Sequence, residues 1–200
     1  MGGLTMESGH KTQQQPDRGL YEWVQALVCS VLAAVLLFTF GVRVVGVSGP
    51  SMRDTLQNGD MLLVVNSHLC GGYKQGDVVI AAKAAFEYGE PIVKRIIATE
   101  GQTVDVDFSA GTVCVDGAEL HEPYIREDTR LAEGTVFPFT VPKGCVFLMG
   151  DNRNDSRDSR DPILGAVDTR CLIGRAVFLL IPGETAELNQ REWSRIGSLA

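Results

Sequence analysis

The sequence lacks features on which several large classes of protein depend. Its 200 residues include 18 Lys and Arg against 25 Asp and Glu, a formal net charge of -7, and no stripe of basic side chains. This composition argues against a nucleic-acid partner, because clustered Lys and Arg are needed to neutralise phosphates. Only three histidines are present, and neither His68 nor His121 has neighbours that suggest a catalytic triad.

The five cysteines show no C-x-x-C spacing, so the sequence supports no metal site, and we expect no cofactor. Cys70, Cys114, Cys145 and Cys171 could form disulfides if their part of the chain faces an oxidising compartment. Cys114 and Cys145, however, fall in apolar runs typical of strands, where a buried free thiol is the simpler interpretation. We therefore favour unpaired thiols.

What the sequence does contain is one long apolar run near its start. Trp23 to Val42 spans 20 residues with no charge and only three polar side chains. A helix of that length rises about 30 Å, which is the thickness of the hydrocarbon core of a bilayer. A buried core helix or a cleaved secretory signal usually has a shorter run, so we predict a retained transmembrane helix.

This run divides the chain into three parts. Residues 1–19 are rich in Gly, Gln and charge without periodicity, which predicts a flexible tail. We predict a membrane anchor at residues 20–46 and a single domain at residues 47–200. Basic residues flank the run equally on its two sides, so the positive-inside rule does not decide the orientation.

The third part consists of short β-runs separated by turn signals. Asp116-Gly117 separates two of them as a tight hairpin requires. Two charged stretches without alternation, Ala81–Glu90 and Glu122–Glu133, are predicted to leave the sheet. The predicted fold class is mainly β, an antiparallel sheet or open barrel that follows the transmembrane helix. The predicted strands are Met61–Val65, Asp77–Ala82, Val93–Thr99, Thr103–Phe108, Thr112–Val115, Thr135–Val141, Cys145–Met149 and Arg175–Ile181.

Two stretches of this part combine residues that chemistry could use. The first contains Gly49-Pro50-Ser51, which by itself is usually only a turn. The second contains Lys94 in an apolar strand, where alternation places Lys94 and Ile96 on one face. If that face is packed, the lysine is drawn into the interior. An ordinary strand lysine that extends to water is the alternative.

A third stretch is an apolar strand that continues into a loop of alternating charges, Gly150 to Arg160. Its many oxygen-bearing side chains suggest a calcium loop, but the spacing fails. Counting from Asp151, Arg153 and Pro162 fall where ligands belong, and Ser156 falls where a glycine belongs. Interleaved Asp and Arg can lock a loop through bidentate pairs, and a solvated charge cluster is the alternative.

In this order, the three stretches resemble the type I signal peptidases of bacteria, whose pattern is similar to S-M-x-P-T-L, K-R-V-I and G-D-N-R-x-x-S-x-D-S-R. The likeness covers most of residues 23–181. Each motif alone is weak, whereas their order behind an apolar run is specific. The matching segments here are Ser51-Met52-Arg53-Asp54-Thr55-Leu56, Lys94-Arg95-Ile96-Ile97 and the loop from Gly150 to Arg160.

The resemblance implies a Ser/Lys dyad in which Ser51 is the nucleophile and Lys94 is the general base. It further implies that the Ser156 hydroxyl orients the lysine amine. In some relatives a serine two residues before the nucleophile stabilises the oxyanion, but here that position is Gly49, so backbone N–H groups are expected to do so. The residues that the resemblance implies hold the loop in shape are Asp151, Asp158 and Arg160.

The chain departs from the family pattern at four positions. Asp54 stands where proline is usual, and Ala98, Glu100 and Gln102 replace the common Gly, Pro and Asp after the lysine strand. Glu100-Gly101 can still form the turn, because glycine supplies the positive φ. We expect altered local shape or stability and unchanged chemistry.

A lysine acts as a base only when its amine is neutral. Its reference pKa is about 10.4, so a working value near 7 to 8 requires a decrease of about 3 units, or about 4 kcal/mol. Burial in an apolar site can supply this, because desolvation disfavours the charged form. We therefore expect Ile96 and Ile97 to form a dry wall around Lys94.

The resemblance also implies the substrates and the location. Exported preproteins with N-terminal signal peptides are the implied partners, together with the lipid bilayer. The nine residues from Val42 to Ser51 keep the nucleophile near the lipid surface, at about 3.3 Å per residue. The implied location is a single-pass plasma-membrane protein with a cytoplasmic N-terminus and an extracytoplasmic catalytic domain.

Two other functions fit parts of the pattern. Self-cleaving repressor proteases also resemble this site in pairing Ser with Lys on a β-fold, but they carry a DNA-binding module. The second alternative is a membrane-tethered β scaffold with an inactive site, which the departures at Asp54, Ala98, Glu100 and Gln102 motivate.

Overall fold

The structure is a computed structural model that describes residues 18–184 and 190–199. The chain divides between Phe38 and Thr39 into two compact units, which are described in turn. The predicted tail lies outside the described residues except for Arg18 and Gly19, with which the first helix begins.

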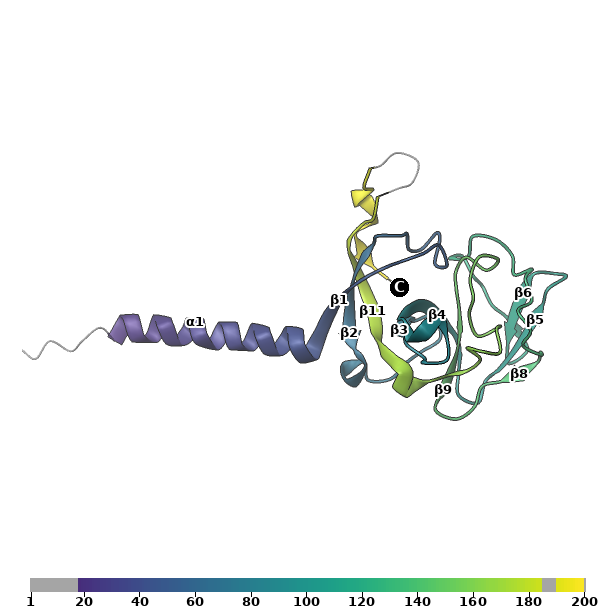
Figure 1. Ribbon diagram of the computed structural model, residues 1–200, viewed down its shortest axis with the longest axis horizontal. Helices are drawn as coiled ribbons and strands as arrows, with labels where there is room; N and C mark the ends of the chain where they lie inside the picture. Colours follow the sequence, from purple (N-terminus) through teal and green to yellow (C-terminus); the bar gives the residue numbers. More distant parts are fainter. Residues whose placement is uncertain (1–17, 185–189, 200) are drawn as a thin grey trace, which may run out of the picture. The chain divides into compact units, whose positions relative to one another are not determined.

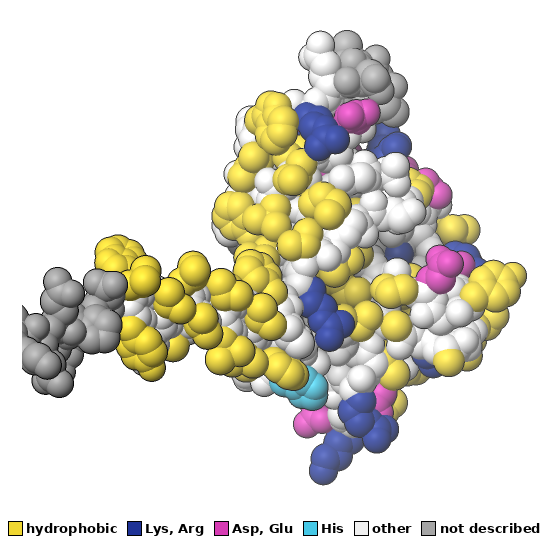
Figure 2. All heavy atoms as spheres, turned by 60° about the vertical axis from the view of Figure 1, so that its left-hand side comes forward, with side chains coloured by type: hydrophobic (Ala, Val, Ile, Leu, Met, Phe, Trp, Pro, Cys, Tyr) yellow, Lys and Arg dark blue, Asp and Glu magenta, His cyan; other side chains and the backbone are white. Residues whose placement is uncertain are grey.

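The first unit contains an apolar helix. Helix α1 (Arg18–Leu36) continues as a π-helical turn (Leu37–Gly41). Among the described residues, this is the one helix that is long and apolar enough to cross a membrane. Hydrophobic side chains cover the face of the helix that Figure 2 shows. Such a surface suits a lipid environment better than water.

The first strand of the second unit lies in residues that the sequence-based division assigned to the anchor. Strand β1 (Val42–Gly46) pairs with β2 (Met61–Asn66), with Val44 opposite Leu63. Residues 42–46, which the prediction included in the anchor, thus form a strand in the structure. The three valines of β1 continue the apolar run in the sequence, but β-branched residues favour a strand when a partner strand is present.

The second unit is built on two antiparallel sheets (Figure 1). The larger sheet has the order β1-β2-β11-β3-β4-β9-β10, and β12 pairs with β11. The smaller has the order β7-β6-β5-β8. The prediction of a mainly β, antiparallel fold after an N-terminal apolar helix is confirmed. The remaining strands are β3 (Val78–Ala81), β4 (Ile92–Thr99), β5 (Thr103–Asp107), β6 (Thr112–Val115), β7 (Ala118–Glu119), β8 (Phe139–Thr140), β9 (Cys145–Met149), β10 (Val167–Asp168), β11 (Leu172–Ile181) and β12 (Gly197–Ser198).

Every predicted strand contains or overlaps an observed one, β7 is the second strand of the hairpin predicted at Asp116-Gly117, and β1, β10 and β12 were not predicted. Thr135–Val141 shortens to β8, because Pro138 has no N–H to donate to a ladder. The turn between β6 and β7 has φ of 53° at Asp116 and 80° at Gly117, as the predicted tight hairpin needs. The stretches predicted to leave the sheet do so, except that Ala81 ends β3.

The turn after β4 shows how the chain accommodates two of its departures from the family pattern. Gly101 has φ of 80°, and the backbone N–H of Gln102 donates to the Thr99 carbonyl at 3.2 Å. The Gln102 side chain accepts from the Thr99 N–H at 2.9 Å, and Glu100 accepts from the Gly144 N–H at 2.7 Å. The expected turn is therefore made, with side-chain hydrogen bonds in place of a proline.

Strand β4 lies in the middle of the larger sheet and is buried on both faces. Ile96 packs with the cluster formed by Val79, Phe86 and Leu148, whereas Ile97 packs in a different cluster with Phe147. Burial on both faces explains why Lys94 and Arg95, although they are adjacent, are only 3% and 2% exposed. Two cations are thus enclosed in one strand, and each needs compensating partners.

Candidate active site

A cleft of about 540 Å³ brings together all three stretches that the sequence analysis singled out. The segment after β1 contributes Gly49 and Ser51, strand β4 contributes Lys94, and the loop after β9 contributes Ser156. Ser51 and Lys94 are 43 positions apart in the sequence, and the order of strands in the sheet brings them to one cavity. The replaced positions Asp54, Ala98, Glu100 and Gln102 are not among the residues that line it.

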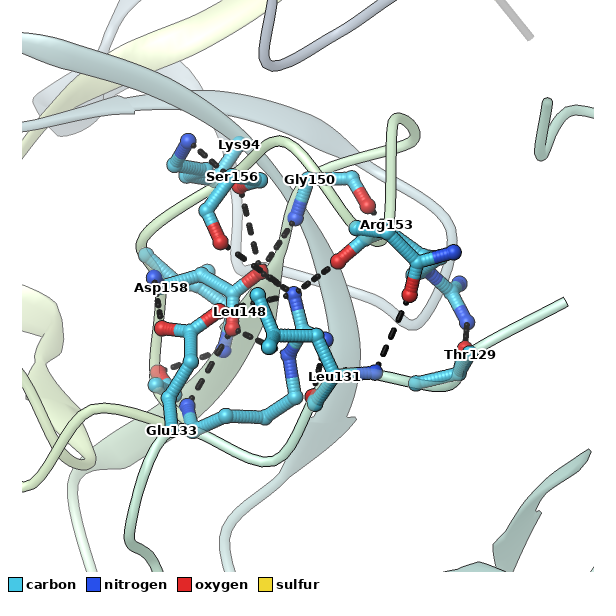
Figure 3. A network of polar contacts seen from close by, with 12 residues as sticks. Lys94, Thr129, Leu131, Glu133, Leu148, Gly150, Arg153, Ser156 and Asp158 are labelled. Carbon is cyan, nitrogen blue, oxygen red and sulfur yellow. Dashed lines mark hydrogen bonds and ion pairs between the residues drawn. The ribbon is translucent and has the colours of Figure 1, made fainter. Parts of the chain in front are cut away.

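The lysine amine in this cleft is desolvated. Lys94 is 3% exposed, and its Nζ donates to Ser156 Oγ at 2.9 Å (Figure 3). Desolvation by burial lowers the pKa of Lys94 from 10.5 to about 8, against the opposing attraction of the Asp158 carboxylate. The prediction from alternation that Lys94 is buried is confirmed, and the alternative, a lysine that extends to water, is wrong.

The Ser156 hydroxyl is itself held by a carboxylate. Its Oγ donates to Asp158 Oδ2 at 3.2 Å, which leaves an oxygen lone pair for the Lys94 N–H. Asp158 also accepts from the Gly150 N–H at 2.9 Å and from two guanidinium nitrogens of Arg160, each at 2.8 Å. Asp158 and Arg160 are completely buried, so this bidentate pair locks the loop at the amine.

The segment that carries Ser51 is tied to the same loop. The Asn152 N–H donates to the Ser51 carbonyl at 3.0 Å, and the Asn152 side chain donates to the Pro50 carbonyl at 3.1 Å. On the other side of the serine, Met52 and Leu56 are 1% and 0% exposed in the core. The nucleophile candidate thus lies on a turn that is anchored at both ends. Asn152 was not among the predicted site residues.

Gly150 lies where the chain can accept no side chain. A Cβ on Gly150 would overlap Ser156 Oγ, and it would lie 2.5 Å from the Ser51 carbonyl oxygen and 2.6 Å from Ser156 Cβ. The φ of Gly150 is one that any residue can adopt, so a side chain is excluded for steric reasons alone. This restriction shows how closely the Ser51 and Ser156 segments approach each other.

Gly150→Ala is therefore expected to push apart the Ser51 turn and the Ser156 loop and to lower the catalytic activity that the resemblance implies by about 10²-fold. The comparison is Gly144→Ala, where a Cβ would meet no atom within 4 Å. Because Gly144 has φ of 73°, this control should lose some thermal stability and retain its activity. Equal activity of the Gly150 variant and the wild type would contradict the described packing.

A second buried ion pair supports the site from the other face of β4. Arg95 donates from Nε and Nη2 to Asp151 at 2.9 and 2.7 Å, and its Nη1 donates to the Gly76 carbonyl at 2.8 Å. The Thr55 hydroxyl donates to the same Asp151 carboxylate at 2.5 Å. The Arg95 guanidinium also lies 4.0 Å from the centroid of the Tyr124 ring. Asp151 therefore links β4 to the Ser51 turn.

The sequence analysis did not identify the residues outside the Gly150–Arg160 loop that pair with it. Arg153 is fully buried and pairs with Glu122 at 2.5 Å and with the Thr129 hydroxyl at 2.9 Å. Glu133 pairs with Arg160 at 3.0 Å. The alternating charges of the loop did indicate bidentate pairs. Their partners, however, come from a charged stretch that carries no motif, and only the folded chain brings it to the loop.

The described residues contain no group of three or more His, Cys, Asp or Glu arranged to hold a metal ion. All five cysteines are free thiols. His68 lines a different cavity, which Ser51 does not share. The ionisable residues that line the cleft with Ser51 are Lys94, Glu87, Glu90, Asp155 and Arg157.

Comparison with known families decides the assignment of this arrangement. The family model described as signal peptidase, peptidase S26, matches residues 20–181. The chain belongs to this family. That span includes helix α1 from Leu20 onward, Ser51, Lys94 and the whole loop from Gly150 to Arg160.

Individual signal peptidases are similar to the chain over most of its length. Signal peptidase I of Bacillus licheniformis is 36% identical over 171 residues, which is 82% of this chain and 89% of the relative. Signal peptidase I T of Bacillus subtilis strain 168 is 34% identical over 86% of this chain and 91% of its own. A probable signal peptidase I-1 of Synechocystis is 32% identical over 92% and 90%.

A solved signal peptidase I, from Enterococcus faecalis V583, aligns with 52% of this chain and 96% of its own, at 27% identity and a TM-score of 0.43. The family assignment depends on the sequence matches. The chain is a peptidase of the signal-peptide-processing family, as the resemblance implied.

Proposed function

We propose that this chain is a membrane-tethered serine endopeptidase that removes N-terminal signal peptides from exported preproteins. Ser51 is the nucleophile and Lys94 is the general base. One observation carries the proposal: the buried amine of Lys94, with a lowered pKa, lines the same cleft as the Ser51 hydroxyl.

The hydrogen bond to Ser156 supports the role of the lysine. In its neutral form the amine has two N–H donors and one lone pair, and one donor is used on Ser156 Oγ. This bond restricts the rotation of the amine and leaves its lone pair to accept the Ser51 proton. Ser156 is thus a positioning residue, because its own proton is donated to Asp158.

Catalysis then follows the acyl-enzyme route. As Lys94 takes the hydroxyl proton, Ser51 Oγ bonds to the scissile carbonyl carbon, and the carbonyl electrons move onto its oxygen. Collapse of this intermediate breaks the peptide C–N bond, and the Lys94 ammonium gives its proton to the leaving amine. Lys94 next takes a proton from a water molecule whose oxygen attacks the ester carbon. The bond from this carbon to Ser51 Oγ then breaks, and the Lys94 ammonium returns the proton to Ser51 Oγ.

The developing oxyanion needs hydrogen-bond donors. Gly49 supplies no hydroxyl, and its backbone N–H donates to the Asn58 side chain at 3.1 Å. We assign the developing oxyanion to the backbone N–H of Ser51, which lies on the nucleophile's own turn. Oxyanion stabilisation in this chain is therefore assigned to the main chain.

Membrane tethering is assigned to helix α1. The π-helical turn that follows α1 ends at Gly41, ten positions before Ser51. A fully extended chain of that length spans about 33 Å, so a substrate that is itself held in the bilayer suits this enzyme. The proposed orientation has a cytoplasmic N-terminus and an extracytoplasmic catalytic unit.

An inactive β scaffold is the alternative function. It gains no support from the cleft, because the four departures from the family pattern that suggested it lie outside the cavity lining. Cleavage of a signal-bearing precursor by the purified full chain in detergent separates the two functions, since a scaffold leaves the precursor intact.

The pH dependence of this reaction follows from the Lys94 pKa. The neutral amine forms as the pH rises through the pKa of Lys94 in the folded chain. We therefore expect kcat/KM to rise with pH through a midpoint near 8 and to reach a plateau at higher pH. An unperturbed lysine would be only about 0.3% neutral at pH 8, against about half for Lys94. A rising limb centred near 10.5 would contradict the desolvation argument.

A further inference from the structure

The charged stretch between β7 and β8, which we predicted only to leave the sheet, lies against the catalytic loop. The Asn154 side chain accepts from the backbone N–H groups of Arg130 and Leu131 at 2.9 and 3.0 Å. The Thr135 N–H donates to the Arg160 carbonyl at 2.8 Å. These bonds fix both ends of a short segment whose middle is Glu133.

Glu133 enters the polar network behind the lysine. Its side chain is 9% exposed, and its Oε2 accepts from the Asp158 backbone N–H at 3.1 Å (Figure 3). Its Oε1 lies 3.0 Å from Arg160 Nη2 but accepts no hydrogen bond. The guanidinium charge of Arg160 therefore compensates this oxygen without an aligned hydrogen bond.

The contacts of Glu133 continue to the proposed general base. Glu133 holds the backbone of Asp158, the Asp158 carboxylate accepts from the Ser156 hydroxyl, and Ser156 accepts from Lys94. Glu133 is not among the residues that line the cleft, and its printed partners are Asp158 and Arg160. Any influence on catalysis is therefore exerted through the intervening groups and through its charge.

The charges around the amine are nearly balanced. The groups that act on Lys94 are the carboxylates of Asp158, Glu133 and Asp151 and the guanidinium of Arg160. Asp151 is engaged by Arg95, so Asp158 and Glu133 are the carboxylates that offset Lys94 and Arg160. Without Glu133, one buried carboxylate faces two cations, and the protonated amine loses stabilisation.

We propose that Glu133 is a positioning residue for the general base: it fixes the Asp158–Ser156 relay behind the Lys94 amine, and its negative charge favours the protonated amine. The inference rests on the proposed function of Lys94. In this role the negative charge of Glu133 keeps more of the Lys94 amine protonated. Removal of that charge therefore makes the enzyme more active at moderate pH.

The electrostatics of the cluster agree with this role. Burial, and after it the nearby Asp158 charge, raises the pKa of Glu133 from 4.5 to about 7, whereas Arg160 opposes this effect and Asp161 adds to it. The Glu133 charge also acts on the guanidinium of Arg157, which pairs with Asp161. Glu133 is thus mostly ionised at the pH where Lys94 loses its proton, and its charge raises the Lys94 pKa there.

The test is the pH profile of kcat/KM for Glu133→Gln in the full chain, with a signal-bearing precursor as substrate. Glutamine preserves the shape and the acceptor for the Asp158 N–H while it removes the charge. The midpoint is expected to move about 0.5 to 1 unit to lower pH. At pH 7.5 the variant should then be about two- to threefold faster than the wild type, with the same plateau at high pH.

The matched control is Glu127→Gln, which removes one exposed carboxylate from the same stretch and should leave the profile unchanged. Should Glu133→Gln fail to fold, Glu133→Asp and Glu133→Asn form a second pair that differs only in charge, and Asn alone should show the shift. An unshifted midpoint, or a uniform loss at every pH in a folded variant, overturns the proposal. If the wild-type chain itself does not cleave the precursor, the proposed function is overturned.

Discussion

Lys94→Met is expected to lower kcat/KM for precursor cleavage by about 10³-fold or more, because methionine fills the apolar site without a proton acceptor. The 3% exposure of Lys94 means that a neutral side chain of similar length needs little repacking. Ser51→Ala should cause a similar loss, and the two changes together should cost little more than either alone. Rates are measured on the full chain in detergent at pH 9, where the wild-type base is neutral.

Lys74→Met is the control, since it removes an exposed ammonium without touching the cleft. Lys94→Arg is informative as well, because a guanidinium stays protonated at every accessible pH and should be as inactive as methionine. Retention of more than a tenth of the wild-type activity by either Lys94 variant would exclude the dyad.

The second large effect is on stability. Asp151→Asn is expected to lower the free energy of unfolding by about 3 to 5 kcal/mol, because it leaves the Arg95 charge buried without its carboxylate. A loss of this size lowers Tm by about 10 °C in a chain of this length, as measured by circular dichroism. Activity should fall as well, because the same carboxylate accepts from Thr55 on the Ser51 turn.

Asp128→Asn provides the comparison with an exposed pair. Asp128 lies 2.8 Å from Arg130, but both side chains are about half exposed or more, so its loss should cost no more than about 1 kcal/mol. The double variant Asp151→Leu with Arg95→Met should recover part of the lost stability, because it removes both charges. A Tm for Asp151→Asn equal to that of Asp128→Asn would show that the buried pair contributes little.

Much of the fold was predictable because local patterns specify it. Period-two alternation located the longer strands, and Asp116-Gly117 specified its hairpin. Strands β10 and β12 are two residues long and carry no periodic signal. Strand β1 was hidden because its valines extend an apolar run, and only pairing with β2 distinguishes the two conformations.

The parts of the site that lie in sequence motifs were predictable. Alternation placed Lys94 on the face of Ile96, but it did not show that Arg95 is equally buried, because the burial of both faces depends on which strands flank β4. Glu133 is 25 positions from Asp158 in a segment without a motif. Such long-range partners are determined by loop packing, for which a single sequence carries no periodic signal.

The most direct measurement of the central claim is the titration of the Lys94 amine itself. Heteronuclear NMR of the full chain with isotope-labelled lysine resolves few signals, and Lys94→Met identifies the one that belongs to the site. The proposed mechanism predicts a midpoint near 8 for this signal. A Lys94 midpoint at the reference lysine pKa, about 10.4, would contradict a desolvated general base. The lysines of the chain are Lys11, Lys74, Lys83, Lys94 and Lys143.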